Sequence, residues 1–293
     1  MPRIAGLLLC AAATSSAAAT ASDVLFVHVG KTCGGTIAAE LQKNRVAYHE
    51  VHLDKVDGET LAKYKHVIVS ARDPVDRVIS AFNWRSPHAC RKRNGGCTPP
   101  RAVEKFDGER GFYNCFPDVQ HFVDAVTARS QEERQGTTLT CHMLAYSFFH
   151  GVGVGAGGGS HIGKGLSWYV GPVLHDLLRR ESDLWVVRAE ACEHDLEGAI
   201  RWLRDDDTLD VLRSGWVHKA RNTTDETSTT IDGSSRKKLQ QRMEAEYQIL
   251  EIVLDASVNY GAKRRRGLQK ELLVDGGGVC RSLAGKTHVN TNC

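Results

Sequence analysis

The sequence has little net charge, and this already limits the classes of protein to which it can belong. Its 38 lysine and arginine residues nearly balance 35 aspartate and glutamate residues, so the formal net charge is only +3. That excess is too small to indicate a nucleic acid as partner. Apolar residues make up 41% and charged residues 25%, which excludes a disordered or collagen-like chain. The 293 residues suit one large α/β domain or two small ones.

The sequence also lacks long hydrophobic runs. Its most apolar stretch, residues 4–13, spans about ten residues, whereas about twenty are needed to cross a bilayer. This stretch follows Arg3 and precedes small residues that end in Ala19-Thr20-Ala21. The layout predicts a secretory signal peptide over residues 1–21, with a weak anchor or a transit peptide as alternatives. We expect membrane association only if this segment stays uncleaved.

Cysteine is the one residue type in unusual number, with nine copies. Cleavage after Ala21 would remove Cys10 and leave an even number, which indicates disulfides in a secretory chain. Two pairs are close enough in sequence to join locally, Cys90 with Cys97 and Cys280 with Cys293. The cysteines and histidines show no zinc-ligand spacing, so no metal is expected.

Short apolar runs alternate with helical patterns along the chain, which predicts a parallel sheet. The expected fold is a three-layer α/β fold, similar to that of P-loop proteins, with a central parallel sheet flanked by helices. The expected strands cover residues 23–29, 46–53, 66–70 and 184–188. The expected helices begin at residue 36 and cover residues 75–84, 117–129, 138–149, 193–204 and, as one long helix, 234–258.

The segment Gly30–Thr36 follows the first strand and opens the first helix. Its glycines let backbone N–H groups turn inward around an anion, and the helix start adds partial positive charge. Lys31 contributes a full charge, and Thr32 and Thr36 contribute hydroxyls. This pattern is typical of a phosphate cradle. It is not the nucleoside triphosphate P-loop, because that motif needs a glycine where Leu25 stands.

A second anion-binding pattern follows the third strand. Arg72 comes two residues after it, and Pro74 favours a helix start. A guanidinium matches the geometry of a phosphate bidentately. We therefore expect Arg72 and Ser80 to converge on a second phosphate at the carboxyl end of this strand. The alternative is that Arg72 and Asp73 form an ordinary ion pair at the helix start.

Together, the two patterns resemble the sulfotransferases, and most of all the Golgi carbohydrate sulfotransferases near the heparan sulfate 2-O-sulfotransferase branch. The resemblance covers residues 24–260, with gaps in the loop 90–110 and in the glycine-rich insertion. It implies 3′-phosphoadenylyl sulfate as donor, no metal, a carbohydrate or polysaccharide acceptor, and a place in the Golgi lumen or outside the cell. The implied sulfotransferase domain covers residues 22–260, and residues 261–293 form a basic and glycine-rich tail.

The resemblance also assigns residues to the donor. The implied contacts to the 5′-phosphosulfate come from Lys31, Thr32, Cys33, Gly34, Gly35 and Thr36. Arg72 and Ser80 would hold the 3′-phosphate. Lys219, Arg221 and Thr223 belong to a basic segment that would close over the nucleotide, although Asn222 within it is also a glycosylation acceptor.

Cys33 departs from the family pattern, in which a small residue such as glycine or alanine usually stands. We interpret it as a small spacer. Apart from Cys10 and Cys33, the sequence has seven cysteines, an odd number that cannot all pair with one another. Either Cys33 joins a disulfide or at least two thiols stay free. We expect the second, since a disulfide would place a covalent link in the donor loop.

The base that takes the acceptor's proton is expected at the end of the second strand. His49, Glu50 and His52 are the candidates there, and His52 is favoured. Strand alternation places Glu50 and His52 on one face and His49 on the other. Two other classes of function stay open, namely a P-loop kinase or nucleotide hydrolase, and a secretory protein that binds an anion or nucleotide without catalysis.

Overall fold

A parallel sheet forms the centre of the part of the chain that the structure describes. The structure is a computed structural model, and it describes residues 22–86, 109–128, 138–150, 160–180, 183–208, 211 and 230–261. Within these residues the sheet has four strands in the order β2-β1-β3-β4, and every neighbouring pair is parallel. The strands are β1 (Val24–Val27), β2 (His49–Val51), β3 (His66–Ala71) and β4 (Leu184–Arg188). The predicted α/β class with a parallel sheet is confirmed.

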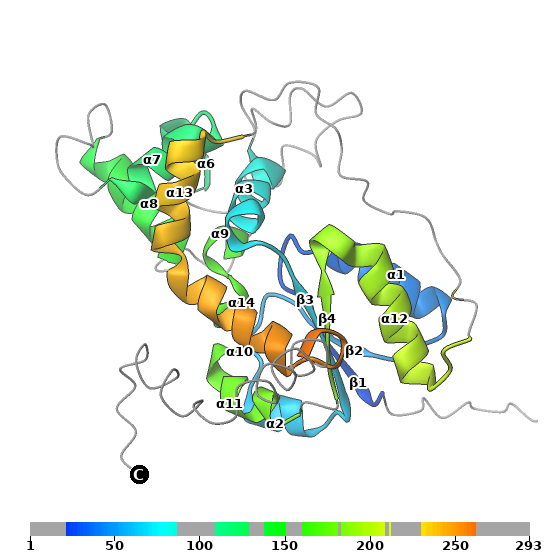
Figure 1. Cartoon of the computed structure of the whole chain (residues 1–293). Coiled ribbons are helices and arrows are strands. Elements are labelled where there is room, and N and C mark those ends of the chain that lie inside the picture. The colour runs from blue at the N-terminus through cyan, green and yellow to red at the C-terminus, as the bar shows by residue number, and fades with distance from the viewer. Residues whose placement is uncertain are drawn as a thin grey trace, which may run out of the picture.

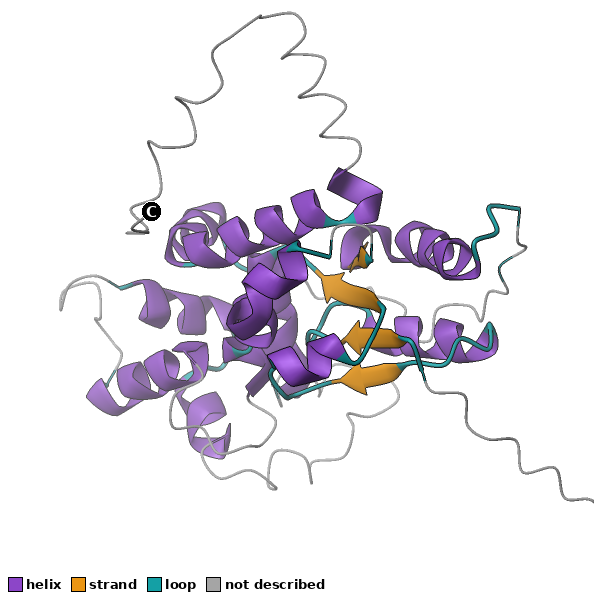
Figure 2. Ribbon diagram, turned by 90° about the horizontal axis from the view of Figure 1, so that it is seen from below, coloured by secondary structure: helices purple, strands orange, loops and turns teal. Residues whose placement is uncertain are grey.

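Helices cover both faces of this sheet (Figures 1 and 2). One face carries α1 (Gly34–Lys43) and α12 (Cys192–Arg204). The other face carries α2 (Gly58–Ala62), α10 (Leu166–Val170), α11 (Leu174–Leu178) and α14 (Glu244–Ala256). Two short 3-10 turns, Gly171–Val173 and Ala189–Ala191, join neighbouring elements. The layers are therefore helix, sheet and helix.

Strand β1 shows why the sheet needs cover on both faces. Val24 and Phe26 pack with α1 and α12, whereas Leu25 and Val27 pack with the helices of the opposite face. All four side chains are buried. A strand that is buried on both faces reads in the sequence as a continuous apolar run. This is why the β1 run could be recognised from the sequence.

A second core lies outside the sheet, among helices at the upper left of Figure 1. These helices are α3 (Pro74–Arg85), α6 (Glu109–Cys115), α7 (Val119–Thr127), α8 (Leu139–His150), α9 (Ser160–Gly163) and α13 (Gly233–Arg242). Phenylalanines fill the centre of this core. The Phe112 ring contacts both Phe82 and Phe148, with ring centroids 5.8 and 4.0 Å away. A disulfide between Cys115 and Cys141 joins α6 to α8.

The long helix predicted over residues 234–258 is instead two helices, α13 and α14, which meet at Met243. Figure 1 shows the chain changing direction there. Leu239 and Met243 belong to the core outside the sheet, whereas Val253 and Ala256 belong to the core on the sheet. One straight helix would not reach both cores, so the break lets each half pack against its own.

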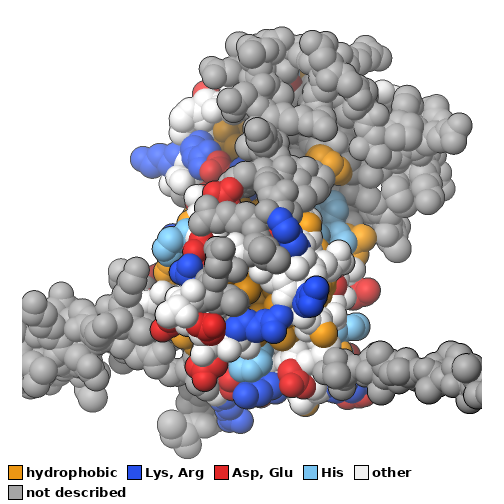
Figure 3. Space-filling view, turned by 90° about the vertical axis from the view of Figure 1, so that its right-hand side faces the viewer, with side chains coloured by type: hydrophobic (Ala, Val, Ile, Leu, Met, Phe, Trp, Pro, Cys, Tyr) orange, Lys and Arg blue, Asp and Glu red, His pale blue; other side chains and the backbone are white. Residues whose placement is uncertain are grey.

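Several predictions fall outside the described residues. They are the signal peptide at 1–21, most of the tail at 261–293, and the cysteine pairs Cys90–Cys97 and Cys280–Cys293. Among the described residues, no helix combines the length and apolarity required to cross a membrane. The surface in Figure 3 intersperses basic and acidic side chains, in keeping with the small net charge.

Candidate functional site

The carboxyl ends of the strands form one edge of the sheet, and the predicted site residues follow two of these ends. From β1 the chain passes through α1, on one face of the sheet, to the neighbouring strand β2. From β3 it passes to β4, which lies on the opposite side of β1 from β2, and α10 and α11 of this connection lie on the other face. The direction of winding therefore changes between β1 and β3. Ligands of open α/β sheets bind at such a switch point. The loop Gly30–Gly35 and Arg72 lie there.

The backbone of this loop has an unusual shape. The φ angle is 71° at Lys31 and 60° at Cys33, but it is not positive at Thr32 between them. Alternation between right- and left-handed residues makes a concave nest in which successive N–H groups point to one side. Thr32 is fully buried. Its hydroxyl donates to the Val29 carbonyl and lies 2.6 Å from Ser70 Oγ, so it anchors the nest to β3.

Helix α1 begins at this nest without a cap. Its N-cap residue Cys33 makes no side-chain cap hydrogen bond, and its first turn has no acidic residue. Thr36 is 4% exposed, and its hydroxyl has no hydrogen-bond partner. The partial positive charge of the helix start is therefore not offset locally. A helix N-terminus of this kind is suited to bind an anion.

Lys31 adds charge beside the nest, and the structure shows what holds it. Its Nζ atom lies 3.6 Å from the centre of the Trp84 ring, over the ring face. Trp84 comes from the end of α3 and is 41% exposed. A cation over an aromatic face is attracted by the ring quadrupole. Sequence reasoning missed Trp84, because only the fold brings α3 to the loop.

The expectation that Cys33 stays outside any disulfide is wrong. Cys33 pairs with Cys192, which lies 159 residues further along the chain and is buried as the first residue of α12. Helices α1 and α12 pack side by side on one face of the sheet, so their first turns meet. The disulfide therefore joins the nest to the segment after β4. No local signal in the sequence indicates this pairing.

Arg72 lies beside the nest. Its Nη1 atom donates to the Lys31 carbonyl at 3.3 Å. Asp73 does not pair with Arg72 but caps α3 through Asp76 N and accepts a 2.7 Å hydrogen bond from Tyr247. This excludes the alternative of an Arg72–Asp73 ion pair. Ser80 is half-buried on α3, and in the described part of the chain no hydrogen bond links it to Arg72.

Arg77 holds the segment around α9 in place next to the site, a role that the sequence did not reveal. Its guanidinium is buried and donates to the carbonyls of His161, Ile162 and Lys164. Burial lowers the pKa of Arg77, and the three carbonyls compensate the buried cation. The arrangement holds α9, and with it the His161 ring, against the nest.

Next to the nest, three side chains from two adjacent strands meet. His28 directly follows β1, and its Nδ1 atom lies 2.6 Å from Oε1 of Glu50 in β2. His52 directly follows β2, and its Nδ1 atom lies 3.0 Å from the His28 carbonyl oxygen. The His28 and His52 rings stack at 4.0 Å. His49 lies apart from them and stacks on Tyr64, which agrees with the predicted alternation of faces.

The surroundings of His28 and His161 favour the neutral forms of both rings. Burial, and then the charge of His52, lowers the pKa of His28 despite the opposing effect of Glu50. Burial, followed by the charges of His52 and Lys31, lowers the pKa of His161 to about 3. The two rings also leave no room for a side chain at the loop positions that they contact, which are therefore glycines. A Cβ atom at Gly34 would overlap the His28 ring, and one at Gly30 would overlap His161.

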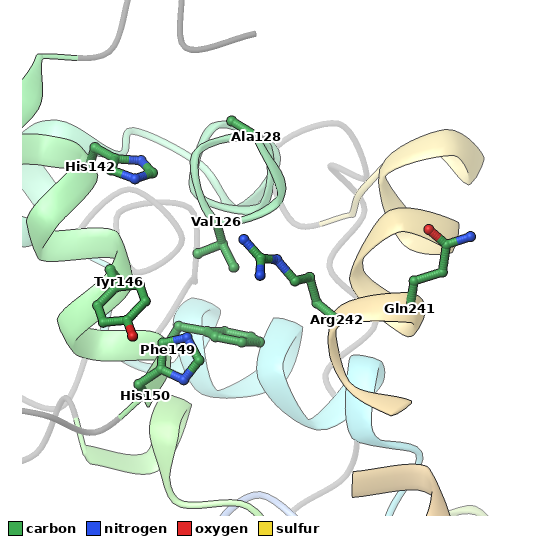
Figure 4. Close-up of a pocket in the computed structure, with 8 residues that line it drawn as sticks. All are labelled: Val126, Ala128, His142, Tyr146, Phe149, His150, Gln241 and Arg242. Carbon is green, nitrogen blue, oxygen red and sulfur yellow. The ribbon is translucent and has the colours of Figure 1, made fainter. Parts of the chain in front are cut away.

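Other predicted residues are not placed at this site. Lys219, Arg221 and Thr223 lie outside the described residues. A separate cavity of about 520 Å³ opens between α7, α8 and α13, with the side chains of Tyr146, His150 and Arg242 at its wall (Figure 4). None of the predicted site residues lines it.

No protein-family model matches this chain, and comparison with curated proteins and with solved structures finds no significant match. A proposal for its function therefore depends on the geometry of the site.

Proposed function

We propose that the protein is a sulfotransferase that moves a sulfuryl group from 3′-phosphoadenylyl sulfate to a hydroxyl of a carbohydrate acceptor, in the Golgi lumen or after secretion. The single observation that carries the proposal is the uncapped, acid-free start of α1 at the switch point of the sheet. The nest and the buried Thr36 hydroxyl there offer donors to the 5′-phosphosulfate.

Positive side chains support the same assignment. Lys31 lies in the nest and Arg72 lies beside it, so one anion with two phosphate groups would meet both. The 3′-phosphate is the group that distinguishes this donor from ATP, and Arg72 is its proposed partner. The disulfides fit a secreted or lumenal protein, in which oxidising conditions maintain them.

His52 is the proposed base. Because its Nδ1 atom faces the His28 carbonyl, Nδ1 carries the proton and Nε2 keeps the lone pair that accepts one. Glu50 is occupied by His28, and His49 lies on the other face. In the proposed reaction the bond between sulfur and the donor's bridging oxygen breaks, while a bond from sulfur to the acceptor oxygen forms. The acceptor's proton passes to His52, and 3′-phosphoadenosine 5′-phosphate leaves with the electron pair.

Ligand binding tests the donor. We expect 3′-phosphoadenosine 5′-phosphate to raise the melting temperature of the protein, and ATP with Mg²⁺ to raise it less. The variant Lys31→Ala should weaken this stabilisation, whereas Lys238→Ala, which removes an exposed lysine of α13, should not. Stabilisation by ATP with Mg²⁺ alone would refute the sulfotransferase and favour a kinase or nucleotide hydrolase.

Transfer of labelled sulfate to a panel of polysaccharides, glycolipids and tyrosine peptides tests the reaction. We expect His52→Ala to lower kcat by about 10²- to 10⁴-fold, the usual contribution of a general base. His175→Ala removes an exposed histidine on α11 and should leave kcat unchanged. Binding of the nucleotide without transfer to any acceptor would indicate a protein that binds the donor without catalysis.

A further inference from the structure

We propose that His28, Glu50 and His52 form a binding site for a divalent transition-metal ion, with Zn²⁺ as the preferred ion. Each of the three offers one ligand atom, and these atoms all lie within 4.8 Å of one another. Two imidazole nitrogens and one carboxylate oxygen are a donor set that zinc uses in sites with an open coordination position. The spacing of these residues along the sequence did not reveal the set, because they come from two strands.

The backbone places the three ligands rigidly. Strand β1 pairs with β2 so that Phe26 lies opposite Glu50 and Val27 opposite Val51. The pairing continues one step further, since His28 N donates to the Val51 carbonyl at 3.0 Å. Glu50 lies within β2, and His28 and His52 are the first residues beyond β1 and β2, so the pairing of the two strands positions all three ligands.

The hydrogen bond of His52 is the one expected of a metal ligand. A metal-binding histidine usually donates its other ring N–H to a carbonyl or carboxylate, which fixes the tautomer and the ring orientation. His52 Nδ1 faces the His28 carbonyl oxygen at 3.0 Å, so its Nε2 atom is left to bind an ion. Stacking of the His28 ring with Phe26 and with His52 restrains the orientation of the second imidazole.

The donor set favours an ion bound by imidazole rather than by oxygen alone. Glu50 is the one carboxylate of the cluster, whereas Mg²⁺ and Ca²⁺ are bound mainly by several oxygen ligands. Imidazole ligands suit Zn²⁺, Cu²⁺ and Ni²⁺. We therefore expect Zn²⁺ to bind far more tightly than Mg²⁺.

The zinc site itself rests on this geometry alone, but its consequence rests on the proposed function. An ion on Nε2 of His52 takes the lone pair that would accept the acceptor's proton. Zn²⁺ is thus expected to inhibit sulfate transfer, and a chelator is expected to restore it. Inhibition should lower kcat, because the ion occupies the base rather than the nucleotide nest.

Calorimetric titration of the full chain with ZnCl₂ tests the site. The chain should carry no histidine tag, and its thiols should be alkylated beforehand so that only the disulfide-bonded cysteines remain unmodified. We expect saturable binding of one ion. His28→Ala and His52→Ala each remove a ligand and should weaken zinc binding strongly. The loss in affinity should exceed the roughly 10- to 100-fold that follows when a hydrogen-bond partner of a metal ligand is removed. Glu50→Gln, which keeps the shape of the side chain, should weaken it as well.

The variant His49→Ala is the matched control, because His49 is adjacent in sequence but stacks on Tyr64, away from the cluster. It should bind Zn²⁺ like the unchanged chain. Circular dichroism of each variant confirms that it folds. Absence of saturable binding, equal affinity for Mg²⁺, or an equal loss in His49→Ala would each overturn the zinc site. Zinc binding without any sulfate transfer would leave the site standing and count against the proposed function instead.

Discussion

At the scale of single residues, the candidate site depends on glycines that lie under imidazole rings. Gly34 begins α1, and the His28 ring occupies the place where its side chain would be. The ring cannot easily give way, because Glu50 holds its Nδ1 atom at 2.6 Å and His52 stacks on it at 4.0 Å. Gly34 is therefore needed for the space it leaves, in addition to any contact with a ligand.

The variant Gly34→Ala tests this packing. The added methyl group would push the His28 ring out of place, and overpacking of this kind typically costs about 1–3 kcal/mol of unfolding free energy. Urea unfolding followed by circular dichroism measures the loss. Gly58→Ala is the control, because Gly58 also begins a helix and no atom lies within 4 Å of its added Cβ. Equal stability of the two variants would mean that the ring moves aside at no cost.

At the scale of elements, the sequence was informative wherever the signal was local. The β1 run was recognisable because each of its residues is apolar and buried, and the loop because glycines follow that run directly. The pairing of Cys33 with Cys192 and of His28 with Glu50 was not predictable in this way. It depends on which helices and strands become neighbours, and that is decided by tertiary packing.

The disulfide between Cys33 and Cys192 joins the starts of two helices, and it should matter for both stability and ligand binding. Replacing both cysteines by alanine should cost about 2–5 kcal/mol of unfolding free energy. The same change at Cys115 and Cys141 should cost about 1.5 kcal/mol less in the chain-entropy model, because those cysteines are 26 rather than 159 residues apart.

Ligand binding separates the two disulfides further. Only the Cys33–Cys192 pair belongs to the nest, so only its removal should weaken binding of 3′-phosphoadenosine 5′-phosphate in calorimetric titration. Cys115–Cys141 joins α6 to α8 within the core outside the sheet. An equal loss of nucleotide affinity in both double variants would show that the effect comes from general destabilisation.

At the scale of the whole molecule, the segment after α14 completes the sheet. Among the strands that the structure describes, β4 lies at an edge of the sheet, and its Val186 is fully buried. The side chain of Asn259 pairs with the Val186 backbone in both directions, accepting from its N–H at 3.1 Å and donating to its carbonyl at 2.7 Å. The Arg188 guanidinium lies over the Tyr260 ring, with its Cζ atom 4.3 Å from the ring centre. These contacts take the place of a further strand.

Two shortened chains test where the folded unit ends. A chain that ends at residue 261 keeps Asn259 and should melt at the same temperature as the full chain, as the predicted boundary before the glycine-rich tail requires. A chain that ends at residue 257 removes Asn259, the partner of the partly buried Val186 N–H and carbonyl, and a group left buried without a partner costs about 1–3 kcal/mol. Because 1 kcal/mol corresponds to roughly 2–4 °C in a domain of this size, its melting temperature should fall by at least several degrees in calorimetry. The substitution Asn259→Ala in the full chain should reproduce most of that fall. If the chain ending at 261 melts as low as the one ending at 257, then the tail itself stabilises the fold, and the boundary predicted at this point is wrong.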